Sequence, residues 1–289
     1  MSDSPVHHDT IASGDHRLHR ITAAPDGIPS ARLAILHGYG DHAGRFVHFM
    51  RWMAERDVAC YAIDQRGHGE STGRRCHINN WSEYLDDLAT FMATPELATK
   101  TDQPPLFVLG HSHGGLVVAA AGIRQQLDRC RGVILSSPYL DLKMPVPWHK
   151  RWIGRIGARL FPAMPVRSGV ADQPLSRDPQ MNLDTQSDPH CLGIATPRWF
   201  ETATAAQAEV RAKAAEFQLP LLMLVATADT IANPTAAVAF YEHCGSSDRT
   251  LKVYEGFRHE LLRELGREQV FEDVLDFVRA RANTSAVLS

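Results

Sequence analysis

A serine between glycines is the residue whose setting points most directly to chemistry. The motif G-H-S-H-G at residues 110–114 places Ser112 after the apolar run 107–109 and before a series of small residues that begins at Gly115. A G-x-S-x-G motif between a strand and a helix is typical of a nucleophile elbow, a strained turn whose glycines keep the surrounding backbone free of side chains. A glycine-rich turn with an ordinary serine is the alternative. Phosphate-binding turns do not match, because G-x-x-x-x-G-K-S/T is absent and G-x-G-x-x-G does not follow the first apolar run.

An acidic residue and a histidine later in the chain complete a catalytic constellation with this serine. Asp229 follows the apolar run 221–225, and His259 follows the run 251–254. If these runs are parallel strands, their carboxyl ends meet at the edge of the sheet where Ser112 lies, in the required order of serine, acid and histidine. His259 would then accept the serine proton, and Asp229 would hold the imidazole tautomer and stabilise its charged form.

Asp141 is the competing candidate for the acid. It follows the apolar run 132–135, and some enzymes with this kind of site take the acid from that position. We favour Asp229 because of its place in the chain order, and because Asp141 leads into a segment without strands, where a hinge fits better. For His259 the alternative is a solvated loop residue, one of 15 histidines in the chain.

Attack by Ser112 on a carbonyl carbon creates a negatively charged oxygen, which backbone N–H groups can stabilise. In sites of this kind one N–H belongs to the residue after the serine, here His113, and a second comes from the loop after an early strand. The motif H-G-Y-G at residues 37–40 supplies such a loop, and we expect the Tyr39 N–H to be the second donor. A plain glycine turn is the alternative.

Short apolar runs alternate with longer amphipathic segments along most of the chain. Continuous apolarity suits strands that are covered on both faces, and the alternation predicts an α/β fold with a doubly wound, mostly parallel sheet. Amphipathic helices are expected at residues 81–92 and 268–282. The expected strands are residues 32–36, 59–63, 106–109, 132–135, 221–225 and 251–254.

Residues 139–218 interrupt this alternation, because they contain no convincing strand and prolines recur through them. We interpret them as a helical cap inserted into a core domain formed by residues 1–138 and 219–289. The first part of the insertion, residues 147–161, has a basic face beside an apolar one. We favour a cap helix that packs on the core and lines an apolar entrance, over a surface that touches a membrane or micelle directly. The expected lining residues are Trp148, Trp152, Leu160 and Phe161.

The composition of the 289-residue chain fits one globular α/β domain with an insertion. A net charge of -3 gives no reason to expect a nucleic-acid partner. The five cysteines are scattered and lack a C-x-x-C pair, so neither a disulfide framework nor a zinc site is indicated. No secretory signal is evident, and the longest apolar stretch, residues 219–226, is far shorter than the roughly 20 residues of a membrane-spanning helix. We therefore expect a cytoplasmic protein without metal or organic cofactor; its oligomeric state is not indicated.

Beyond the serine motif, several segments resemble the monoacylglycerol lipase and lysophospholipase group of α/β-hydrolases, which have a serine aminopeptidase S33-type domain. The resemblance covers nearly the whole chain. Besides G-H-S-H-G, it rests on H-G-Y-G-D-H-A-G-R-F at 37–46, D-Q-R-G-H-G-E-S at 64–71, L-S-R-D-P at 175–179, S-D-P at 187–189, A-D at 228–229 and H-E-L-L-R-E at 259–264.

The resemblance implies hydrolysis of a single acyl ester through an acyl-serine, without cofactor, and a mobile cap at the insertion. It places the triad at Ser112, Asp229 and His259 and the oxyanion donors at Tyr39 and His113. Two departures concern the shape of the acyl pocket: His113 replaces the usual methionine, and Tyr39 is bulkier than the usual small residue. The expected substrate is a monoacylglycerol or lysophospholipid. A small-ester carboxylesterase and a non-enzymatic receptor for an apolar ligand are the alternatives.

Overall fold

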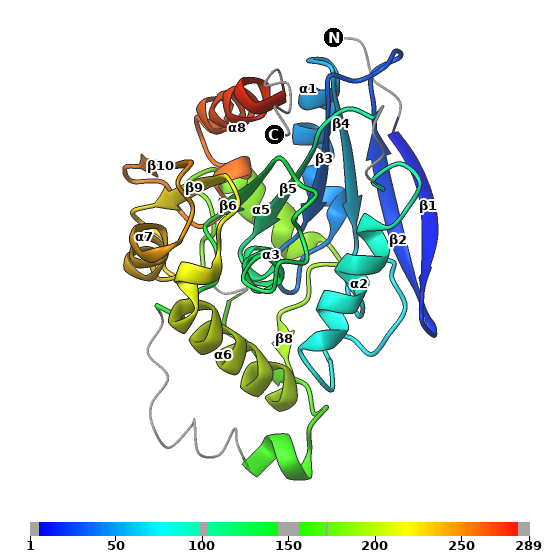
Figure 1. Ribbon diagram of the computed structural model, residues 1–289. Helices are drawn as coiled ribbons and strands as arrows, with labels where there is room; N and C mark the ends of the chain where they lie inside the picture. Colours follow the sequence, from blue (N-terminus) through cyan, green and yellow to red (C-terminus); the bar gives the residue numbers. More distant parts are fainter. Residues whose placement is uncertain (1–5, 99–102, 144–155, 171–172, 283–289) are drawn as a thin grey trace.

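The structure is a computed structural model that describes residues 6–98, 103–143, 156–170 and 173–282. Within these residues, eight strands form one sheet in the order β1-β2-β4-β3-β5-β6-β9-β10 (Figure 1). All neighbouring pairs from β4 to β10 are parallel, and β1 and β2 are antiparallel additions at one edge. The expected α/β fold with a mostly parallel sheet is therefore confirmed. The strands are β1 (Val6–Ser13), β2 (His16–Ala23), β3 (Ala31–Leu36), β4 (Val58–Ile63), β5 (Leu106–His111), β6 (Gly132–Ser136), β9 (Leu221–Ala226) and β10 (Arg249–Tyr254).

Helices cover both faces of this sheet, as its apolar central strands require. Every residue of β3, β4, β5 and β9 is buried, because their side chains alternate between two separate cores. Leu33 and Ile35 pack with α1 (Val47–Ala54) and α8 (Arg267–Ala282). Ala34 and Leu36 of the same strand belong to the other core. That second core includes side chains of α2 (Ser82–Met92), α3 (His113–Gly122), α6 (Pro197–Ala212) and α7 (Pro234–His243).

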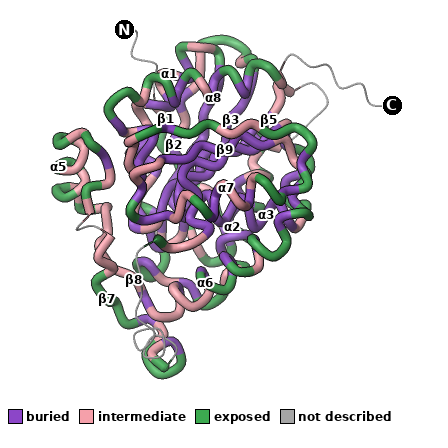
Figure 2. Tube along the Cα trace, turned by 90° about the vertical axis from the view of Figure 1, so that its left-hand side faces the viewer, coloured by how far each residue is buried: buried purple, intermediate pink, exposed green. Residues whose placement is uncertain are grey.

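Between β6 and β9 the chain leaves the sheet. Its described elements here are a helical turn at residues 156–160, β7 (Val166–Arg167), α5 (Pro179–Ser187), β8 (Ile194–Ala195), α6 and η2 (Ala214–Glu216). Helix α6 buries Trp199, Ala203 and Val210 in the core that it shares with α3. Helix α5 buries no residue and lies apart from the sheet (Figure 2). Two further short helices, η1 (Ala43–Phe46) and η3 (Leu261–Arg263), follow β3 and β10.

The first two strands of the chain form a hairpin at the edge of the sheet. The hairpin of β1 and β2 turns at Gly14, where a φ of 55° favours glycine. Its strands are largely polar, and the apolar pattern of the sequence does not predict them. Among the described residues, no helix has both the length and the apolar character needed to span a membrane.

Candidate active site

Ser112 occupies a sharp turn between the end of β5 and the start of α3. Its backbone has φ 52° and ψ −116°, a strained conformation for a residue with a side chain. The turn can form only between glycines: a Cβ at Gly110 would lie 2.5 Å from the Gly114 carbonyl oxygen, and one at Gly114 would lie 2.4 Å from the Leu36 oxygen. The serine hydroxyl is thus held at the carboxyl edge of the parallel strands, where ligands of such sheets bind.

The structure brings Ser112, His259 and Asp229 into one hydrogen-bonded chain. The Oδ2 atom of Asp229 lies 2.7 Å from Nδ1 of His259, and Nε2 of His259 lies 2.8 Å from the Ser112 Oγ. Asp229 is fixed in turn, because its Oδ1 accepts the backbone N–H groups of Ile231 and Ala232. With Nδ1–H donating to the carboxylate, Nε2 is free to accept the serine proton.

Asp141 lies in a different environment from Asp229. Its carboxylate is half-exposed, 3.5 Å from Arg211 Nη1, and it accepts a hydrogen bond from the Asn233 amide. An isolated bridge between Leu142 and Ala232 joins this stretch to the loop after Asp229. Asp141 therefore serves the junction between the insertion and the core, while Asp229 contacts the imidazole.

The surroundings of His259 favour its protonated form. Burial by itself opposes the charge, but the Asp229 carboxylate outweighs it, and Glu260 and Asp41 add to that effect, so the pKa of His259 is raised above its ordinary value of 6.5. The neighbouring His111 behaves in the opposite way, because burial and the charge on His259 lower its pKa to about 3. The site thus holds one imidazole that can accept a proton and one that stays neutral.

The two expected oxyanion donors flank Ser112. His113 begins α3, and the loop that contains Tyr39 passes so close that a Cβ at Gly38 would lie 3.4 Å from the Ser112 Cβ. The Tyr39 side chain has partners of its own: its hydroxyl donates to the Cys76 carbonyl, and its ring stacks on Trp199 with centroids 3.5 Å apart. Only the backbone of Tyr39 is then needed beside the reacting oxygen.

The side chain of His113 is fully buried in a cluster of aromatic rings. Within the described part of the chain, neither ring nitrogen has a hydrogen-bond partner. Burial, with smaller effects from nearby histidines, lowers the pKa of His113 well below its ordinary value, so the ring stays neutral. The neutral ring therefore fills apolar space at the position where the group that the sequence resembles usually has methionine. The rings around it belong to Tyr39, Trp81, Tyr84 and Trp199.

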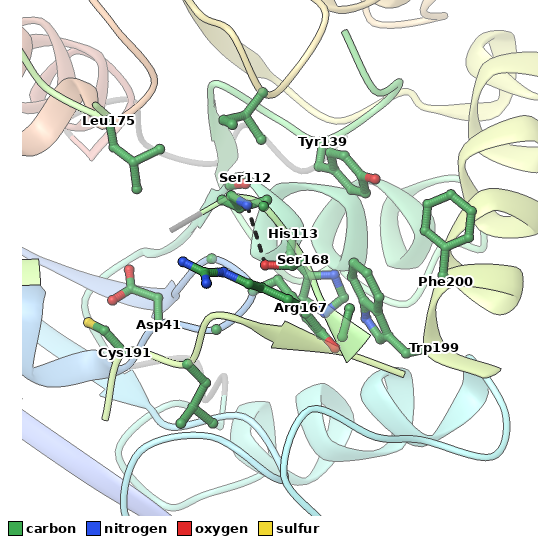
Figure 3. Close-up of a pocket in the computed structure, with 18 of the residues that line it drawn as sticks. Asp41, Ser112, His113, Tyr139, Arg167, Ser168, Leu175, Cys191, Trp199 and Phe200 are labelled. Atoms are coloured by element: carbon green, nitrogen blue, oxygen red, sulfur yellow. Dashed lines mark hydrogen bonds between the residues drawn. The ribbon is translucent and has the colours of Figure 1, made fainter. Parts of the chain in front are cut away.

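A cavity of about 1130 Å³ adjoins Ser112 and has two chemically different ends. Figure 3 shows Tyr139, Trp199 and Phe200 on one side of the serine and Asp41 and Cys191 on the other. The aromatic end offers apolar surface to a hydrocarbon chain. The opposite end is polar, and its further lining residues include Arg45, Thr185 and Glu260.

The structure corrects the prediction of which cap residues line the cavity. Leu160 and Phe161 are 67% and 61% exposed and are not among the cavity-lining residues, whereas Gly157 of the same turn is. The turn at 156–160 directs small residues inward and its large apolar side chains outward. Trp148 and Trp152 lie outside the described residues. The apolar wall is instead formed by Tyr139, Trp199 and Phe200, of which Trp199 and Phe200 follow Pro197 at the start of α6.

The polar end of the cavity is organised by Arg45. Its guanidinium lies 2.8 Å from Asp41 and 2.5 Å from Glu260, and it donates to the Cys191 thiol at 3.3 Å. Ligand atoms of Asp41, His42 and Cys191 lie within 4.8 Å of one another, so this set could coordinate a metal ion. A metal ion would, however, have to compete with the Arg45 guanidinium for the same carboxylate and thiol.

Comparison with known proteins places the chain among hydrolases. The family model described as serine aminopeptidase, S33 matches residues 27–266. A monoacylglycerol lipase of Mycolicibacterium smegmatis is 29% identical over 281 residues, which cover 96% of this chain and 98% of that protein. An uncharacterised abhydrolase domain-containing protein of Dictyostelium discoideum is 28% identical over 94% of this chain, which spans only 28% of that longer protein. The crystal structure of a soluble variant of monoglyceride lipase from Saccharomyces cerevisiae, in complex with a substrate analogue, shares the fold with a TM-score of 0.88, 20% identity and 98% coverage of both chains.

Proposed function

The chain belongs to the serine aminopeptidase S33 family of α/β-hydrolases, and from this membership and the geometry around Ser112 we propose that it hydrolyses carboxylic esters of lipid-like substrates. One observation carries the proposal: the hydrogen-bonded chain from Asp229 through His259 to the Ser112 hydroxyl. The serine oxygen attacks the ester carbonyl while His259 takes its proton, and the backbone N–H groups of Tyr39 and His113 stabilise the resulting oxyanion.

The reaction then proceeds through an acyl-serine. When the tetrahedral intermediate collapses, the bond between the carbonyl carbon and the alcohol oxygen breaks, and the alcohol leaves with the proton from His259. A water molecule, deprotonated by the same imidazole, attacks the carbonyl carbon of the acyl-serine. The bond from that carbon to the Ser112 Oγ then breaks, the Oγ takes the proton from His259, and the acid is released. The buried Asp229 stabilises the imidazolium in both steps.

The two ends of the cavity support a monoacylglycerol or lysophospholipid as the substrate. The wall formed by Tyr139, Trp199 and Phe200 would take the acyl chain, and the end around Arg45 would take the hydroxylated alcohol. This assignment agrees with the name of the mycobacterial relative, a monoacylglycerol lipase. The insertion, residues 139–218, would act as the cap over the core formed by 1–138 and 219–289, since it contributes the aromatic wall.

Acyl length is expected to control the rate. Each methylene buried in the cavity contributes about 0.8 kcal/mol, which corresponds to about a fourfold gain in kcat/KM until the apolar end is filled. Steady-state kinetics with p-nitrophenyl esters from acetate to decanoate measure this gain. A profile that peaks at acetate or is flat would contradict the lipid pocket and favour the small-ester carboxylesterase.

We also propose that the cap touches the lipid surface from which the substrate comes. Large apolar side chains are exposed together on one stretch of the insertion, namely Ile156, Leu160, Phe161, Met164 and Val166. Each of these side chains is about half or more exposed, and insertion into the interfacial region of a bilayer would bury that apolar surface.

Vesicle binding tests this contact. Replacing Leu160 and Phe161 together with serine should weaken cosedimentation with phosphatidylcholine vesicles about tenfold or more, because both side chains lose their apolar burial. Ile28, which is 91% exposed but lies far along the chain in a loop before β3, provides the control, and Ile28→Ser should bind as the unmodified protein does. Equal binding by all three proteins would contradict the proposed contact.

A further inference from the structure

Glu264 is a fully buried carboxylate for which the mechanism above has no use. Its Oε2 accepts the backbone N–H of Arg258 at 2.9 Å. Its Oε1 accepts the backbone N–H groups of Arg177 and Leu265, each at 2.8 Å, and the Ser176 hydroxyl at 3.1 Å. Burying a carboxylate costs several kcal/mol unless hydrogen bonds or a counter-charge replace its water. Both oxygens of Glu264 are occupied by such donors, so the side chain joins specific stretches of backbone.

The donors come from the two stretches that meet beside the catalytic histidine. Arg258 immediately precedes His259, and on the other side the Glu260 N–H donates to the Leu175 carbonyl at 3.0 Å. The Arg258 side chain adds a bond to the Ser176 carbonyl. The backbone on both sides of the imidazole is thus hydrogen-bonded to the insertion.

The far end of the same insertion segment holds the oxyanion loop. The Leu192 N–H donates to the Gly40 carbonyl at 2.7 Å, and a Cβ at Gly40 would lie 2.4 Å from the Leu192 oxygen. Between these ends, α5 has no buried residue, so apolar packing does not explain its position. Polar contacts hold it, including the bond from Arg45 to Thr185 and the pair of His42 with Asp188 at 2.8 Å.

We propose that Glu264 is a positioning residue that fixes the catalytic histidine by tying its loop to residues 175–192 of the insertion. The inference rests on the proposed function, because it assigns His259 the part of the catalytic base. Reacting groups must be held within a fraction of an ångström, and a displacement of about 1 Å can reduce a rate about a hundredfold. Through residues 175–192, one segment contacts both the base loop and the oxyanion loop.

The variant Glu264→Gln tests this role with little change of volume. In either orientation, the NH₂ group of the new amide faces a backbone N–H that needs an acceptor. If the amide oxygen takes the position of Oε1, the Arg258 N–H loses its acceptor. We expect kcat to fall about ten- to hundredfold and KM to change by less than about threefold. Ser176→Ala removes one of the four donors to Glu264, together with the contacts of the same hydroxyl with the Arg263 carbonyl and the Asp178 N–H. It should lower kcat by a smaller factor, so it supplies the measurement if the first variant does not fold.

Asp87 provides the matched control. Its carboxylate is equally buried and accepts bonds from Ser13 and Arg66, away from the triad. Asp87→Asn should lower the thermal midpoint while leaving kcat within about twofold, when all proteins are assayed well below their midpoints. A Glu264→Gln enzyme with unchanged kcat, or with a change confined to KM, would overturn the proposal. If the unmodified protein hydrolyses no ester, the proposed function itself has failed, and the two failures are thereby distinguished.

Discussion

Replacing Ser112 with alanine should reduce kcat for ester hydrolysis about 10⁵- to 10⁶-fold, because it removes the hydroxyl that lies 2.8 Å from His259 Nε2. Small residual activity is expected from the oxyanion donors and from substrate binding alone. Stopped assays with a p-nitrophenyl ester at high enzyme concentration measure both rates. The fold should survive, since the substitution removes one oxygen atom.

Ser137 supplies the control for this substitution. It is also buried, directly after the carboxyl end of β6, and within the described residues its Oγ has no hydrogen-bond partner. Ser137→Ala should therefore keep kcat within about threefold of the unmodified protein. If Ser112→Ala retained more than about one hundredth of the original kcat, the assignment of the nucleophile would be wrong.

Asp229→Asn should lower kcat about 10⁴-fold, because the amide can donate to Nδ1 and favour the tautomer that cannot accept the serine proton. The pH dependence should change as well. Activity needs neutral His259, so kcat/KM falls as pH decreases through the pKa of this residue, which Asp229 keeps above 6.5. Without the carboxylate, burial lowers that pKa, and the acid limb of the profile should move to lower pH.

Asp141→Asn is the matched control for the acid. Its half-exposed carboxylate contacts Arg211 and Asn233 rather than the imidazole, so kcat and the position of the acid limb should stay close to those of the unmodified protein. The reverse outcome, in which Asp141→Asn abolishes activity and Asp229→Asn does not, would transfer the role of the acid to Asp141.

Several elements could be predicted from the sequence because their signals are local. The strands inside the sheet are largely apolar runs, and the structure confirms them as β3, β4, β5, β6 and β9, together with the predicted strand β10 at the edge. The parallel sheet then directs residues that follow β5, β9 and β10 to one edge, and Ser112, Asp229 and His259 lie together there. Once the sheet is known to be parallel, the order of these motifs along the chain is enough to predict that the three residues meet at one edge.

Other features depend on contacts that a local pattern does not reveal. The hairpin of β1 and β2 is largely polar, and its position follows from pairing of β2 with β4 rather than from an apolar pattern. Amphipathic spacing around Leu160 and Phe161 indicates an apolar face, but not whether it meets the cavity or the solvent. Glu264 ends the motif H-E-L-L-R-E at 259–264, in which the sequence indicates a role for His259 alone, and only the folded chain shows the Glu264 carboxylate between two loops.

The central claim, that Ser112 forms the acyl-enzyme, is tested most directly by mass spectrometry of the intact protein during turnover. Acid quenching in the first milliseconds with an excess of p-nitrophenyl decanoate should trap a single added decanoyl group, and fragmentation should locate it on Ser112. A decanoyl adduct on another residue would contradict the account. So would hydrolysis at the full rate by a protein in which a fluorophosphonate probe leaves Ser112 unmodified.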